Sequence, residues 1–179
     1  MSDTLVTYLS EEEIRKTNQD LGKKISASYA NVMKPGEELL LIVTLKGAVF
    51  FAADLAREIT IPTTLDFVRV ASYGAGTKSS GTVRILKDVE SNLENQHVLI
   101  LDEIVDSGRT LQFLIERVRS SNPKTLKVCS LLSKPSRREV EINVDFLGRE
   151  VEDKFLVGYG LDYAEKYRSL KSICYLDGR

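Results

Sequence analysis

The sequence predicts an α/β fold with a mostly parallel central sheet flanked by helices. In the central part of the chain, segments with strand and helix patterns alternate, and this order is typical of parallel strands joined by crossover helices. Two expected strands, residues 39–44 and 97–101, are largely apolar runs, as expected where both faces of a sheet are covered. A length of 179 residues favours one domain, or one domain with a small attached lobe.

The expected elements follow from periodicity and from local start and stop signals. Ser10 and Glu13 have the spacing of a capping box, and apolar residues then recur at helical spacing, which predicts a helix over residues 11–33 that ends before Pro35. Further helices are expected at residues 48–59 and 109–120, and strands at residues 39–44, 63–71, 83–86, 97–101, 125–132, 144–147, 155–158 and 173–176. Residues 72–82 lack periodicity and contain three glycines, which favours either a functional or a disordered loop.

The charge balance excludes some classes of partner. Lysine and arginine number 25 against 26 acidic residues, so nothing supports broad electrostatic binding of nucleic acid or of an anionic membrane, and neither partner is expected. Apolar runs stay shorter than the roughly 18 residues of a membrane helix. The N-terminus lacks a basic segment followed by an apolar core, so we expect a cytoplasmic location.

The single histidine and the two cysteines limit the possible chemistry. With His97 as the one histidine, a histidine-based metal cluster is impossible, and a Ser-His-Asp triad could be built only around that residue. Cys129 and Cys174 are distant in sequence and flanked by apolar residues, which favours reduced core thiols over a disulfide or a zinc site.

Residues 97–111 carry the strongest functional pattern. An apolar strand leads into two adjacent carboxylates, Asp102 and Glu103, and Asp106 then opens a turn before a helix that begins near Arg109. The small residues of this turn are Ser107, Gly108 and Thr110. A helix N-terminus beyond the carboxyl end of a strand suits a phosphate, and neighbouring carboxylates could hold Mg²⁺ or sugar hydroxyls. The alternative is a plain helix cap with solvated acids, which a lone Asp-Ser-Gly would favour.

This stretch resembles the phosphoribosyl-pyrophosphate (PRPP) motif of the type I phosphoribosyltransferases. The family's motif begins with Glu-Asp or Asp-Asp, whereas this chain has Asp102 followed by Glu103. The resemblance implies the type I phosphoribosyltransferase fold, with a small hood lobe formed by the N- and C-terminal segments. It implies Mg²⁺ as cofactor, Asp106 as general base, and a PRPP site whose 5′-phosphate and ribose contacts come from Asp102, Glu103, Asp106, Ser107, Gly108, Arg109 and Thr110.

Three further segments resemble those of the hypoxanthine-guanine branch of this family. Residues 45–48, here called the pyrophosphate loop, are similar to the family's Leu-Lys/Arg-Gly loop, which implies that Lys46 and Gly47 bind pyrophosphate. Residues 72–82 are similar to its mobile lid, with Ser72 and Tyr73 at the start. Taken alone, the first segment fits an ordinary β–α turn and the second a plain surface loop.

The purine-binding residues are implied by two later matches. Lys134 stands where the family uses a lysine that donates to the purine 6-oxo group, and an ammonium prefers an oxo over an amino substituent because it has no acceptor. Residues 153–168 resemble the family's purine-binding segment. The resemblance assigns base contacts to Phe155, Leu156 and Asp162, a metal contact to Asp162 beside Asp102 and Glu103, and a pyrophosphate contact to Arg168.

The family matches imply a purine salvage transferase that uses PRPP and hypoxanthine, and also guanine, and that forms a homodimer or homotetramer. Three alternatives stay open. The first is a transferase of the same fold for xanthine or a pyrimidine, and the second is an RNA-binding regulator built on this fold. The third is a nucleotide-binding module without catalysis.

Overall fold

The structure is a computed structural model that describes residues 4–73 and 82–177. Its centre is a six-stranded sheet in the order β4-β3-β2-β5-β6-β7, and all neighbours pair in parallel except β3 and β4. These strands are β2 (Leu39–Thr44), β3 (Thr63–Tyr73), β4 (Thr82–Lys87), β5 (His97–Val105), β6 (Thr125–Ser133) and β7 (Phe146–Glu150). The predicted fold class, a mostly parallel sheet flanked by helices, is therefore confirmed.

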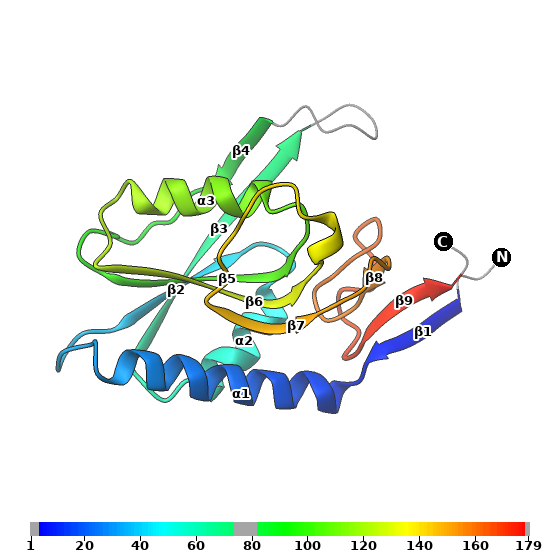
Figure 1. Cartoon of the computed structure of the whole chain (residues 1–179), viewed down its shortest axis with the longest axis horizontal. Coiled ribbons are helices and arrows are strands. Elements are labelled where there is room, and N and C mark those ends of the chain that lie inside the picture. The colour runs from blue at the N-terminus through cyan, green and yellow to red at the C-terminus, as the bar shows by residue number, and fades with distance from the viewer. Residues whose placement is uncertain (1–3, 74–81, 178–179) are drawn as a thin grey trace.

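Helices cover both faces of this sheet (Figure 1). α1 (Glu11–Ala30) and α2 (Val49–Glu58) pack on one face, where Leu41, Val43 and Leu99 belong to a shared buried cluster. α3 (Arg109–Arg119) covers the other face and packs against alternate residues of the same strands, such as Ile42 and Ile100. Alternate side chains of a strand point to opposite faces, so β2 and β5 are apolar throughout.

A smaller antiparallel sheet joins the two ends of the chain. It contains β1 (Thr4–Leu9), β9 (Ile173–Asp177) and β8 (Leu156–Val157), in the order β1-β9-β8. Figure 1 shows β1 and β9 side by side at one end of the molecule, beyond the central sheet. The sequence analysis did not predict β1, because its partner strand lies at the other end of the chain.

Two expected element boundaries need correction, and one short helix was not expected. The first helix ends at Ala30 rather than at residue 33, and Gly36, with φ of 86°, forms the turn that follows. The strand expected at 97–101 continues to Val105, because its ladder with β6 extends through Asp102 to Val105. The short turn Pro135–Arg137 is a 3₁₀ helix that was not expected.

Two local predictions, the capping box and the buried thiols, are confirmed. The Glu13 amide donates to Ser10 Oγ at 3.3 Å and the Ser10 amide donates to Glu13 Oε2 at 2.9 Å, which completes the capping box. Cys129 and Cys174 are free and buried. Within residues 4–73 and 82–177, no helix is both long and apolar enough to cross a bilayer.

Candidate active site

The pyrophosphate loop, the residues of the PRPP motif and Lys134 lie at, or just after, the carboxyl ends of β2, β5 and β6, where open α/β sheets bind their ligands. Thr44 is the last residue of β2, and Asp102 and Glu103 lie near the end of β5. The Thr44 hydroxyl donates to Asp102 Oδ1 at 2.6 Å and lies 3.5 Å from Glu103 Oε2. One hydroxyl therefore links the two carboxylates.

These two acids occupy an environment that opposes their charge. Desolvation raises the pKa of Asp102. Desolvation also raises the pKa of Glu103 well above its usual range, and the negative charge of Asp102 raises it further. A divalent cation would relieve both effects, and carboxylate oxygens are the ligands that Mg²⁺ prefers. The donor set therefore fits the expected cofactor.

The pyrophosphate loop packs directly on Glu103. A Cβ atom placed on Gly47 would lie 1.9 Å from Glu103 Oε1, so a larger residue there would have to displace the Glu103 carboxylate. On its other side, a Cβ on Gly160 would lie 1.8 Å from the Gly47 carbonyl oxygen. The peptide between Leu45 and Lys46 is cis. The loop is thus held between β5 and the segment that follows β8.

The turn between β5 and α3 forms a small hollow of about 100 Å³. Its lining includes Asp102, Asp106, Ser107, Gly108 and Thr110. Gly108 has φ of 86° and precedes the first residue of α3, Arg109, so the helix begins where the sequence predicts. The first amides of a helix lack partners within the helix and lie at the positive end of its dipole, which suits a phosphate.

A second hollow, of about 250 Å³, adjoins the first through Ile104 and Asp106. The predicted purine-binding residues line it together: Lys134, Phe155, Leu156 and Asp162. Lys134 is only 8% exposed, and its ammonium donates to the Lys154 carbonyl at 2.7 Å. Phe155 is 46% exposed, so part of its ring is available to a flat ligand.

The two predicted pyrophosphate cations meet at a carboxylate that the sequence analysis did not select. Glu165 Oε2 lies 3.0 Å from Lys46 Nζ and 3.3 Å from Arg168 Nη2. Arg168 also contacts Asp162 Oδ1 at 2.8 Å. The hydrogen bond from Lys46, followed by that from Arg168, lowers the pKa of Glu165. Lys46 and Arg168 therefore lie on one carboxylate, which is an internal anion between them.

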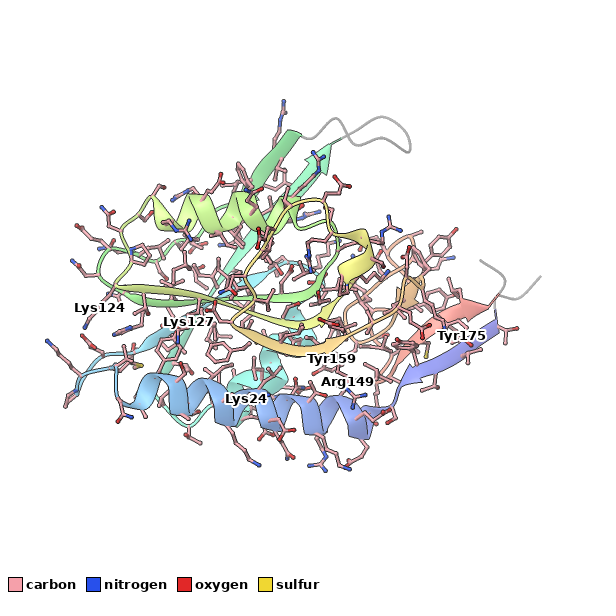
Figure 2. The ribbon with its side chains drawn as sticks, in the orientation of Figure 1. Lys24, Lys124, Lys127, Arg149, Tyr159 and Tyr175 are labelled. Carbon is pink, nitrogen blue, oxygen red and sulfur yellow. The ribbon has the colours of Figure 1, made fainter. Side chains whose placement is uncertain are left out.

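A hydrogen-bond network around the buried side chains of Asn18 and Tyr159 anchors the segment after β8 to the first two helices. Asn18 of α1 donates to the Tyr159 hydroxyl at 2.8 Å, and that hydroxyl donates to Asp54 Oδ2 of α2 at 2.7 Å. Figure 2 labels Tyr159 in the region between α1 and this segment. Through this network the helices that support the pyrophosphate loop also support the segment that carries Asp162 and Arg168.

Not every predicted grouping is formed. Within the described residues, Asp102, Glu103 and Asp162 do not gather into one cluster of metal ligands. Ser72 and Tyr73 form the end of β3, so they do not belong to an irregular loop. Residues 74–81 of the expected lid lie outside the described residues.

Three site residues were missed by the sequence analysis: Thr44, Arg137 and Glu165. The signal for Thr44 was its position as the one polar residue that ends an apolar strand. No local signal distinguishes Arg137 or Glu165, since each is an exposed charged residue whose role depends on distant partners.

Comparison with known proteins places this fold and site in a class. A sequence model described as the phosphoribosyl transferase domain matches residues 10–164, so the chain belongs to that family. The chain is 45% identical over 178 residues to the hypoxanthine-guanine phosphoribosyltransferase of Mycobacterium tuberculosis strain H37Rv, covering 99% of this chain and 88% of that protein. It is 40% identical over 173 residues to the hypoxanthine phosphoribosyltransferase of Escherichia coli K12, covering 97% of this chain and 96% of the relative.

A solved structure agrees with this placement. The crystal structure of a hypoxanthine phosphoribosyltransferase from Staphylococcus aureus superposes with a TM-score of 0.88 at 38% identity, covering 96% of this chain and 90% of that one. The family predicted from the sequence is therefore confirmed.

Proposed function

We propose that this protein transfers the 5-phosphoribosyl group of PRPP to N9 of hypoxanthine, and also of guanine, to give IMP or GMP and pyrophosphate. The observation that carries the proposal is that two hollows adjoin at Asp106, one lined by the turn between β5 and α3 and the other by Lys134 and Phe155. The names of the relatives support the same substrates.

The acid pair would hold Mg²⁺ and the ribose hydroxyls of PRPP. When bound, Mg²⁺ supplies positive charge that offsets the departing pyrophosphate. Asp102 and Glu103 would hold it, with the Thr44 hydroxyl fixing Asp102. Asp162 is proposed as a further metal contact through the bound substrates. The turn from Asp106 to Thr110 would hold the 5′-phosphate.

Asp106 is proposed to remove a proton from the purine. Hypoxanthine carries one imidazole proton, and when Asp106 accepts that proton from N7, the N9 lone pair can attack C1′ of the ribose. The bond between C1′ and the pyrophosphate oxygen then breaks, and its electron pair leaves with the pyrophosphate. General acid–base catalysis contributes about 10²–10⁴-fold, so positioning and charge stabilisation must supply the rest.

Pyrophosphate would bind between Lys46, the Gly47 backbone and Arg168. The base would stack on Phe155, and the Leu156 backbone would contact its edge. The Lys134 ammonium would donate to the 6-oxo group of the purine. A 6-amino purine would be disfavoured, because its amino group and the ammonium are both hydrogen-bond donors. Burial of Lys134 supports this role, because a desolvated donor binds an acceptor more strongly than an exposed one.

The remaining proposals concern organisation. We propose a single domain over residues 1–179 in which the small sheet is the hood and residues 72–82 act as the lid, in a cytoplasmic homodimer or homotetramer. Sedimentation velocity would give the number of subunits.

The direct test is incubation with PRPP, Mg²⁺ and each base separately, with nucleotide product identified by mass. IMP from hypoxanthine is the expected product. Nucleotide from xanthine or a pyrimidine alone would favour a different transferase, and salt-dependent RNA binding without turnover would favour the regulator.

Two variants test the residue roles. Lys134→Met is expected to lose most of the preference for 6-oxo over 6-amino purines, while Asp106→Asn slows turnover by about 10²–10⁴-fold and leaves PRPP affinity largely intact. Wild-type turnover in Asp106→Asn would remove Asp106 from its role.

A further inference from the structure

Asp106, the general base of the proposed proton transfer, has a cationic side chain beside it. Arg137 is the last residue of the 3₁₀ turn, and its Nε atom lies 3.0 Å from Asp106 Oδ1. Its Nη1 atom lies 3.4 Å from Asp153 Oδ1. One guanidinium therefore spans two carboxylates that come from separate parts of the chain. Arg137 also lines the purine hollow, together with Lys134 and Asp106.

The two oxygens of Asp106 are not equivalent. Oδ1 is inaccessible to solvent and receives no well-directed hydrogen bond from the residues that the structure describes. A buried oxygen without a partner is costly, and the guanidinium at 3.0 Å provides the opposing charge. Because Arg137 contacts Oδ1, the other carboxylate oxygen is left for the purine.

The backbone that carries Arg137 is held firmly. The Lys134 amide donates to the Val105 carbonyl at 2.9 Å, directly beside Asp106. The Arg137 amide donates to the Lys134 carbonyl at 3.2 Å, and the Arg138 guanidinium donates to Ser133 Oγ at 2.6 Å. The same turn thus fixes the donor for the 6-oxo group and the cation beside Asp106.

We propose that Arg137 is a positioning residue that orients the Asp106 carboxylate for proton transfer from the purine. The inference rests on the proposed function, since it assigns Arg137 a role only through Asp106. Arg137 itself does not contact the reacting atoms. Its planar guanidinium meets Asp106 and Asp153 at once, which a lysine ammonium at the same place does less well.

The test compares Arg137→Gln and Arg137→Lys with a matched control, Arg149→Gln. Arg149 forms an ion pair with Glu13 at 3.3 Å, its side chain is similarly exposed, and it lies on β7 beside α1 (Figure 2). Arg137→Gln is expected to lower kcat about tenfold, the scale of one charge-assisted contact, and to leave the KM for PRPP within about twofold. Arg137→Lys should recover part of the loss, and the control should match the wild type in kcat and melting temperature.

A double variant separates action through Asp106 from any other role. If Arg137 works through Asp106, then adding Arg137→Gln to Asp106→Asn should cause almost no further loss in kcat. A similar loss in both backgrounds would overturn the proposal, as would an unchanged kcat in Arg137→Gln with its fold intact. A wild-type protein that makes no nucleotide would instead contradict the proposed function.

Discussion

Replacing Gly160 by alanine is expected to displace the pyrophosphate loop. Gly160 has φ of 101°, and its added Cβ would lie 1.8 Å from the Gly47 carbonyl oxygen. A carbon–oxygen contact is comfortable near 3.3 Å, so the two segments must separate by about 1.5 Å. A misplacement of about 1 Å can cost around 10²-fold in rate, so we expect kcat/KM for PRPP to fall by at least about that factor.

The Gly36→Ala variant measures the cost of placing a side chain on a left-handed backbone without any steric clash. Gly36 has a similar φ of 86°, but nothing lies within 4 Å of its added Cβ. Its substitution should cost about 1–2 kcal/mol from the left-handed backbone alone, or roughly 2–8 °C in melting temperature.

Gly160→Ala should melt clearly lower than Gly36→Ala, since it adds a steric clash to the same backbone strain. Thermal unfolding by circular dichroism and initial rates at varied PRPP measure both effects. Equal melting temperatures for the two variants, with an unchanged KM for PRPP in Gly160→Ala, would refute this reasoning.

Three other expectations concern separate regions. Glu165→Gln should make pyrophosphate a product inhibitor about two- to fivefold tighter, because an exposed carboxylate no longer competes for Lys46 and Arg168, and an unchanged inhibition constant would contradict this. Ser10→Ala should lower the free energy of unfolding by about 1 kcal/mol through loss of the helix cap, and a chemical denaturation curve identical to the wild type would count against it. A hydrogen bond from Lys124, the largest of several causes, lowers the pKa of Glu37 from 4.5 to about 2. The contribution of Glu37 to the stability of the folded protein is therefore present above pH 4.5 and is lost as the pH falls toward 2. Melting temperatures at pH 3 and pH 6 should therefore differ less in Glu37→Gln than in the wild type, and equal differences would exclude the effect.

Elements with a local cause could be predicted from the sequence. The capping box at Ser10 depends on contacts within four residues, and the covered strands are visible as apolar runs. The start of α3 at Arg109 follows from the small residues before it. Their positions came out correctly because each depends on neighbours in the chain.

Elements with distant partners could not be predicted. β1 is stabilised by pairing with β9 at the opposite terminus, and although Val6, Thr7 and Tyr8 favour a strand, so short a segment does not reveal its distant partner. The end of β5 was placed too early because acids usually mark the end of a strand. In this fold the ladder with β6 carries Asp102 onward to Val105.

The sequence by itself determined the α/β class, the family and the short motifs around Asp102 and Asp106, because these depend on residue types at fixed spacing. Only the tertiary structure decided that Lys134 is buried. It also decided which charges meet, since it places Glu165 between two cations and Arg137 beside Asp106. Electrostatic contacts act through space over a few ångströms, so chain separation carries no information about them.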